Sequence, residues 1–142
     1  MRHRIFAHII WTTRDRAPAI DRAGAELLWR MLPRIARQER ALVLEIGIVR
    51  THVHLLIRLH PTTAIPRLMQ RMKGGTSVLA NRGGTAHHEL RWARGYNITS
   101  VHPAGIQAVR QYVRNQHLRH PAESIPDWPP NVALATRAEP RL

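Results

Sequence analysis

Two histidines separated by one apolar residue form the pair of side chains best suited to bind a metal ion. His52 and His54 open the segment 51–59, whose apolar residues otherwise alternate like those of a half-buried strand. Since a strand repeats every two residues, both imidazoles point to the same side, with Cα atoms about 7 Å apart, and can bind one ion. The chain contains 10 histidines, so the pair can equally be two ordinary residues of a sheet.

A predicted helix at residues 105–120 carries the second candidate pair. Its buried stripe is formed by Ile106, Val109 and Val113. At about 100° per residue, Tyr112 and Gln116 are neighbours one turn apart beside that stripe. A tyrosine there is usually a packing residue whose hydroxyl reaches solvent.

Composition limits both the chemistry and the location. The chain has no cysteine, which excludes disulfides and thiolate chemistry and leaves histidine, carboxylate, amide and hydroxyl groups as ligands or nucleophiles. No apolar run approaches the roughly 18 residues of a membrane span, and residues 5–11 are followed by no cleavage site. We therefore expect a cytoplasmic protein with no membrane partner.

The charge balance points to a polyanionic partner. Lys and Arg number 22 against 9 Asp and Glu, a formal net charge of +13, and Lys73 is the single lysine. The planar guanidinium of arginine binds phosphate with two hydrogen bonds and stacks on bases, which favours a nucleic acid. Codon bias would explain arginine in place of lysine, but not the excess of basic over acidic residues.

Hydrophobic periodicity predicts one domain, 1–120, and a Pro-rich C-terminal tail, 121–142. Strands are expected at 4–12, 41–49, 51–59 and 92–101, and helices at 21–38, 65–81 and 105–120. Pro33 can kink the first helix or split it in two, and the second helix can break at Gly74-Gly75. The loop at 82–85 and the adjacent pair His87-His88 are expected on the surface.

A two-residue turn at 50–51 would fix the pairing of the strands on either side of it. Gly47 would then lie opposite His54 and leave room for a metal ion, and Glu45 would lie on the histidine face. A lone carboxylate on an apolar strand needs a partner. Glu45 can orient a ligand from a second layer around the metal, support the metal directly, or reach solvent at an edge.

Five segments together resemble a known family. They are 52–56 after a buried strand, 68–74, 92–96, 100–101 and 108–116, in order between about residue 3 and residue 120. They are similar to the single-tyrosine (Y1) transposases of the IS200/IS605 type, including the REP-associated tyrosine transposases. These belong to the HUH endonucleases, named for two histidines around an apolar residue.

The resemblance implies a fold and a reaction. The fold is α+β: a ferredoxin-like antiparallel β-sheet with helices packed on one face. His52, His54 and Gln116 match the ligands of a divalent metal ion, Mg²⁺ or Mn²⁺. Tyr112 matches the nucleophile that attacks single-stranded DNA and forms a 5′-phosphotyrosine bond, so residues 1–120 would be the transposase domain.

The resemblance also implies partners. Members recognise DNA hairpins at the ends of the element and act as homodimers in which the tyrosine helix can serve the histidine pair of the partner. The expected location is the cytoplasm, at the nucleoid. A basic surface is expected to bind DNA phosphates with an affinity that falls steeply with salt. Its residues are Arg67, Arg71, Lys73, Arg110, Arg114 and Arg119.

The chain departs from the family pattern in two places. Thr51 stands where relatives commonly have an acidic residue, so a positioning role of that carboxylate would be missing, and the segment 97–99 lacks the expected small and aromatic residues. The alternatives left open are a mobile-element transposase, a domesticated or catalytically weak relative, and a non-catalytic module that binds single-stranded nucleic acid. Such modules usually stack bases on exposed aromatics, and aromatics are only 5% here. Relaxases and replication initiators share the histidine pair but usually need a longer chain.

Overall fold

A four-stranded antiparallel sheet forms the centre of the computed structural model, which describes residues 2–82 and 89–129. The strands are β1 (Ile5–Thr12), β2 (Leu42–Ile48), β3 (His52–Leu59) and β4 (Asn97–Val101). Their spatial order is β2-β3-β1-β4, so the two central strands are β3 and β1. This order and the connecting helices confirm the predicted α+β, ferredoxin-like fold.

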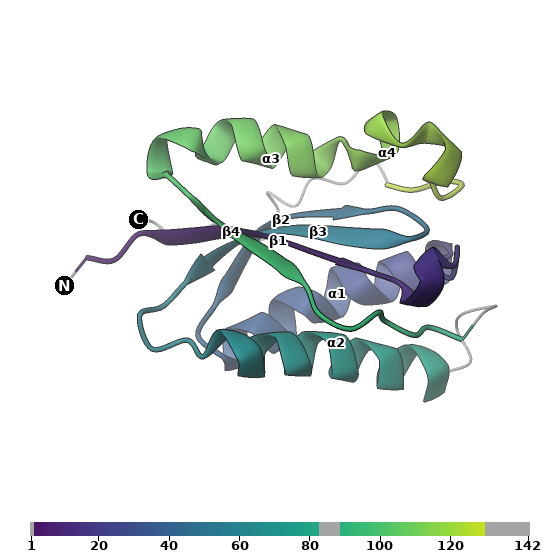
Figure 1. The fold of residues 1–142 in the computed structure, drawn as a ribbon, viewed down its shortest axis with the longest axis horizontal. Helices are drawn as coiled ribbons and strands as arrows, with labels where there is room; N and C mark the ends of the chain where they lie inside the picture. Colours follow the sequence, from purple (N-terminus) through teal and green to yellow (C-terminus); the bar gives the residue numbers. More distant parts are fainter. Residues whose placement is uncertain (1, 83–88, 130–142) are drawn as a thin grey trace.

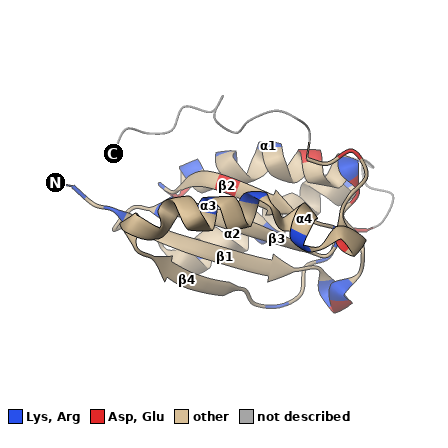
Figure 2. Ribbon diagram, turned by 90° about the horizontal axis from the view of Figure 1, so that it is seen from above, with Lys and Arg blue, Asp and Glu red and all other residues tan. Residues whose placement is uncertain are grey.

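Helices cover both faces of the sheet. Helices α1 (Arg22–Gln38) and α2 (Ile65–Arg82) pack against each other on one face, and α3 (Ile106–Arg114) and α4 (Gln116–Arg119) lie on the other (Figure 1). The expectation of helices on one face was therefore wrong for the last helix. Figure 2 shows α3 from above, running over the sheet on the side of β2 and β3.

The main core lies between the sheet and the first two helices. Val53, Leu55, Ile57 and Leu59 all point into it, as the alternation of strand β3 predicts. The other face of β3 carries His52 and His54 toward α3. The predicted register is confirmed as well, because Gly47 pairs with His54.

Neither predicted helix interruption occurs. Helix α1 begins after Asp21, whose side chain accepts a hydrogen bond from the Gly24 amide at 2.8 Å, and it continues through Pro33. Leu28 and Leu32 before the proline and Ile35 after it are buried, so packing holds one continuous helix.

Helix α2 continues through its two glycines for a similar reason. A Cβ at Gly75 would lie 3.2 Å from Cδ1 of Ile35, so the glycine lets α1 and α2 approach closely. Met72 and Thr76 are buried on either side of it. The predicted surface loop at 82–85 and the His87-His88 pair lie almost wholly outside the described residues.

The last two predicted elements are shorter than expected. Strand β4 begins only at Asn97, because the backbone before it is not extended: Gly95 has a φ of +80°. In addition, Nζ of Lys73 donates hydrogen bonds to the carbonyl oxygens of Ala93 and Gly95, at 2.7 and 2.8 Å. The predicted helix 105–120 is divided at Asn115 into α3 and α4.

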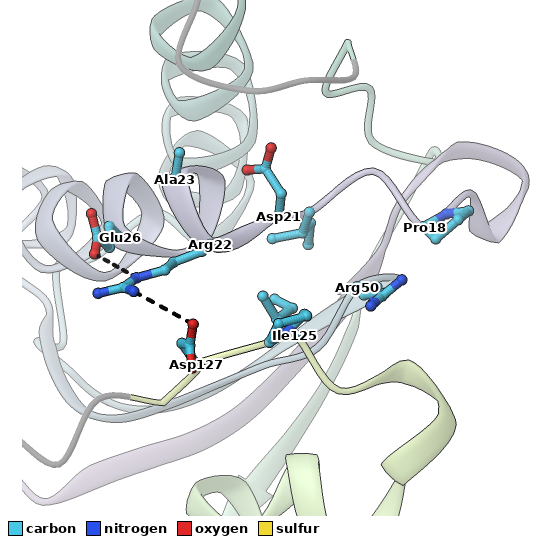
Figure 3. Close-up of a pocket in the computed structure, with 10 residues that line it drawn as sticks. Pro18, Asp21, Arg22, Ala23, Glu26, Arg50, Ile125 and Asp127 are labelled. Atoms are coloured by element: carbon cyan, nitrogen blue, oxygen red, sulfur yellow. Dashed lines mark hydrogen bonds and ion pairs between the residues drawn. The ribbon is translucent and has the colours of Figure 1, made fainter.

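The first part of the segment predicted as a tail returns to the domain. A short 3-10 turn (Pro121–Glu123) leads into Ile125 and Trp128, which are buried in the core cluster. The Trp128 ring packs edge-on against Trp29 of α1. Figure 3 shows this segment passing the start of α1, where Asp127 pairs with Arg22 at 3.8 Å.

Candidate active site

The two histidines of the HxH motif lie together under α3. Their rings are 5.0 Å apart between centroids, and their residues are only 4% and 3% exposed. Strand β3 presents them on one face because they are two residues apart, and the buried residues between and after them anchor the strand from below.

Neighbouring side chains engage the Nδ1 atom of each ring. Nδ1 of His54 lies 2.9 Å from Nε2 of His8 on β1, and Nδ1 of His52 lies 3.0 Å from the Thr51 hydroxyl. Contacts of this kind fix the orientation of a ligand histidine and leave Nε2 as the atom that can face a metal ion.

Helix α3 brings the predicted nucleophile to the histidines of the same chain. The Tyr112 ring lies edge-on to His54, at 5.6 Å between centroids, and to His8, at 5.7 Å. The guanidinium of Arg119 stacks over the Tyr112 ring at 4.5 Å from its centroid. Phenol, imidazoles and cation therefore converge above the middle of the sheet.

Gln116 is fully buried and has one oxygen unsatisfied. Its Nε2 donates to the Tyr112 carbonyl at 2.9 Å, which orients the side chain, while Oε1 has no hydrogen-bond partner. A buried acceptor without a partner is costly. Because Gln116 also lies close enough to His52 to affect its pKa, a metal ion held by the histidines would satisfy this oxygen.

Gly47 acts differently from the prediction. The absent side chain opposite His54 does not leave room for a metal, because the space is filled by helix α3. A Cβ at Gly47 would lie 1.9 Å from the Val113 carbonyl oxygen and 3.0 Å from Cγ of Gln116. The glycine thus sets how closely the helix that carries Tyr112 approaches the sheet.

All three clustered imidazoles favour the neutral form. Burial, together with the nearby His52, His8 and His120, lowers the pKa of His54 to about 3. Burial also lowers the pKa of His52, against the opposing effect of Glu123, and lowers the pKa of His8. Neutral imidazole is the form that binds metal, so little proton competition is expected at neutral pH.

The donor set fits a divalent ion only if the glutamine takes part. Within residues 2–82 and 89–129, no three His, Asp or Glu side chains are grouped so that they could hold a metal ion. Two imidazole nitrogens and one amide oxygen form a mixed shell that suits Mg²⁺ or Mn²⁺ and leaves positions for phosphate oxygens.

Glu45 is buried on the histidine face, as predicted, and its partner is an arginine. Its Oε2 pairs with Nη2 of Arg114 at 3.0 Å, and the carboxylate is about 5% exposed. The ion pair holds α3 against β2, so Arg114 stabilises the position of the helix. A role of Glu45 toward the metal stays a prediction.

The structure does not bring the six predicted DNA-binding residues into one surface. Arg110, Arg114 and Arg119 belong to the helices above the histidines, whereas Arg67, Arg71 and Lys73 belong to α2 on the opposite face of the sheet. Arg67 and Arg71 both pair with Glu39 at 2.7 Å. The α2 residues therefore lie away from the candidate site and are engaged in contacts within the domain.

Sequence reasoning missed three residues around the site: His8, His120 and Glu123. The His120 ring lies edge-on to His52 at 5.2 Å, and Glu123 reaches Thr51 and His52. His8 could have been found as a lone polar residue in an apolar strand, but His120 and Glu123 gave no such signal.

Comparison with known proteins identifies the family. The model of the family "Transposase IS200 like" matches residues 1–116. The chain belongs to the IS200-like transposases. The predicted resemblance to the Y1 family is thereby confirmed, and the chain's family role is DNA transposition.

Individual relatives agree with the family match. The ISDra2 transposase TnpA of Deinococcus radiodurans is 28% identical over 118 residues, which cover 78% of this chain and 82% of the relative. Two solved structures share the fold of this IS200-like transposase. One is a Deinococcus radiodurans R1 protein assigned as a transposase, with a TM-score of 0.62, 22% identity and coverage of 82% and 94% of the two chains. The other is a REP-associated tyrosine transposase bound to a REP hairpin, with a TM-score of 0.64, 10% identity and coverage of 84% and 72%.

Proposed function

We propose that this IS200-like transposase cuts and rejoins single-stranded DNA through a covalent 5′-phosphotyrosine at Tyr112, assisted by a divalent metal ion. One observation carries the proposal: the Tyr112 ring lies against His54 and His8, directly above a pair of neutral imidazoles and an unsatisfied amide oxygen. This combination of groups suits the attack of a phenol on a phosphodiester.

The chemical step is a transesterification. Oη of Tyr112 releases its proton and forms a bond to phosphorus, the bond from phosphorus to the 3′-oxygen breaks, and that oxygen takes up one proton and leaves as a 3′-hydroxyl, so no proton is gained or lost overall. One phosphodiester replaces another, so the energy of the broken bond is kept and a 3′-hydroxyl can later reverse the step without ATP. Bound at His52, His54 and Gln116, a divalent ion would polarise the phosphate and stabilise its developing charge.

Two further groups of the chain support the step. Arg119 lies over the Tyr112 ring, where its guanidinium can contact the phosphate that the tyrosine attacks and stabilise the negative charge that develops there. The hydrogen bond from Gln116 to the Tyr112 carbonyl couples the position of the nucleophile to that of a metal ligand. A metal ion would thus order both.

We further propose that the substrate is single-stranded DNA that contains hairpins and that the chain acts as a homodimer at the nucleoid. The +13 net charge supports a nucleic-acid partner. The solved REP-associated relative is bound to a REP hairpin, which supports the hairpin. No helix in the part of the chain that the structure describes is long and apolar enough to cross a membrane.

The test is a cleavage assay with labelled oligonucleotides. Wild-type protein is incubated with single-stranded hairpin DNA or with a matched duplex, in Mn²⁺, Mg²⁺ or EDTA. We expect a covalent adduct only with single-stranded DNA and a metal, and none after His52→Ala/His54→Ala. Hairpin binding without an adduct would favour a non-catalytic module, and metal-independent cleavage would contradict the mechanism.

A further inference from the structure

Thr51 precedes the histidine pair, and a carboxylate from another part of the chain reaches it. The Thr51 hydroxyl donates to Oε1 of Glu123 at 2.9 Å, and the same hydroxyl oxygen lies 3.0 Å from Nδ1 of His52. The other carboxylate oxygen, Oε2, lies 3.8 Å from Nδ1 of His52 and 3.8 Å from Nδ1 of His120. The three groups form a chain from carboxylate to hydroxyl to imidazole.

The direction of this chain follows from counting protons. A carboxylate can only accept, and a threonine hydroxyl has a single proton to donate. The Thr51 proton therefore goes to Glu123, and the Thr51 oxygen must accept from His52. The single N–H of the neutral His52 ring is thereby placed on Nδ1, and Nε2 is unprotonated.

The segment that carries Glu123 is built into the domain. The Glu123 carbonyl accepts from the Arg50 amide at 2.8 Å, and the Ser124 carbonyl accepts from Nε of Arg50 at 3.1 Å. Ile125 and Trp128 are buried in the core cluster just after it. Glu123 lies after residues 1–116, which match the family model, in the segment that follows α4.

We propose that Glu123 is a positioning residue that, through the Thr51 hydroxyl, holds His52 in the tautomer that presents a bare Nε2 to the metal ion. This inference rests on the metal-assisted function proposed above. Glu123 would supply the carboxylate that the sequence lacks at position 51. The segment after α4 would thereby contribute a residue to the site. Outer partners of ligand histidines typically change metal affinity about 10–100-fold.

The test compares five proteins: wild type, Glu123→Ala, Thr51→Val, Thr51→Ser and Asp127→Ala. Asp127→Ala is the matched control, because it removes an exposed carboxylate of the same segment that contacts Arg22 and not the site. Thr51→Val removes the hydroxyl without touching the segment. If Glu123→Ala loosens the packing of Ile125 and Trp128, the Thr51→Val variant still tests the proposal.

Two measurements are made on each full-length protein. Nitrogen-15 NMR of the metal-free form reports the tautomer of His52, assigned by the loss of its signals in His52→Gln, and titration calorimetry reports the affinity for Mn²⁺. We expect the Nδ1–H tautomer in wild type, Thr51→Ser and Asp127→Ala. Glu123→Ala and Thr51→Val should lose it and bind Mn²⁺ about 10–100-fold more weakly.

The outcomes separate this inference from the function on which it rests. A hydrogen on Nε2 of His52 in wild type, or wild-type tautomer and affinity in Glu123→Ala and Thr51→Val, would overturn the role of Glu123. Equal losses in Thr51→Ser and Thr51→Val would overturn the hydroxyl relay. Failure of wild type to bind Mn²⁺, with the Nδ1–H tautomer present, would instead contradict the metal-assisted function and with it the role of Glu123 toward the metal.

Discussion

Nε2 of His8 lies 2.9 Å from Nδ1 of His54, and the two rings stack at 5.1 Å between centroids. The contact joins the central strands β1 and β3 on the face covered by α3. It holds the His54 ring from β1, whereas the His52 ring contacts the Thr51 hydroxyl. Each histidine of the pair therefore has its own support.

Replacing His8 should weaken metal binding without changing the ligands. We expect His8→Ala to bind Mn²⁺ about 10–100-fold more weakly than wild type, because the His54 ring loses its partner. The matched control is His60→Ala, since His60 packs against His3 beyond the other end of β3. Calorimetric affinities that are the same for both variants would show that His8 has no such role.

Gly47 should control the placement of the nucleophile. Gly47→Ala places a methyl group against the Val113 carbonyl and pushes α3 outward, so the yield of covalent adduct should fall about 100-fold, as expected for a displacement near 1 Å. The control is Gly74→Ala, where a Cβ meets nothing within 4 Å and should stabilise α2 by about 0.5–1 kcal/mol. Adduct formation by Gly47→Ala at the wild-type level would contradict the close packing described above.

The ion pair between Glu45 and Arg114 should contribute to stability. Arg114→Ala removes the cation that pairs with a buried carboxylate, and we expect the free energy of unfolding to fall by about 1–3 kcal/mol. Adding Glu45→Gln should restore part of this loss, since a neutral amide costs less to bury. Urea denaturation of the single and double variants measures both effects, and additive losses would show that the pair does not interact.

The buried imidazoles should make the metal-free protein sensitive to acid. His54 has a pKa of about 3 in the folded protein and an ordinary value of 6.5, so below about pH 6.5 the unfolded state takes up a proton that the folded state does not. Stability is therefore lost as the pH falls, by about 2 kcal/mol at pH 5 for this one group. Urea denaturation in EDTA should show a smaller loss in His54→Gln than in wild type, because His52 and His8 remain, and equal losses in the two proteins would contradict it.

Local patterns predicted the strands, the hairpin register and the first two helices. The alternation around His52 and His54 fixed which residues of β3 enter the core, and the cap at Asp21 marked the start of α1. The helices are not split at Pro33 or at Gly74-Gly75, because burial of the flanking residues outweighs local helix propensity.

The site was predicted only where its residues share an element or a family motif. The pairs His52 with His54 and Tyr112 with Gln116 are close in sequence, so their spacing places them on common faces. His8 and Glu123 lie far from both motifs and meet the histidines only through the strand order and the return of residues 121–129. Pairwise spacing carries no information on such contacts.

The most direct test of the central claim is to identify the amino acid that carries the DNA. The chain has two tyrosines, and Tyr96 packs against the main core below the sheet, so Tyr96→Phe is a natural control for Tyr112→Phe. Wild-type protein is reacted with hairpin DNA and Mn²⁺, digested with nuclease and trypsin, and analysed by mass spectrometry. We predict a nucleotide mass on the tryptic peptide 111–114 in wild type and Tyr96→Phe, and no adduct in Tyr112→Phe. An adduct on any other residue, or one that persists in Tyr112→Phe, would contradict the proposed mechanism.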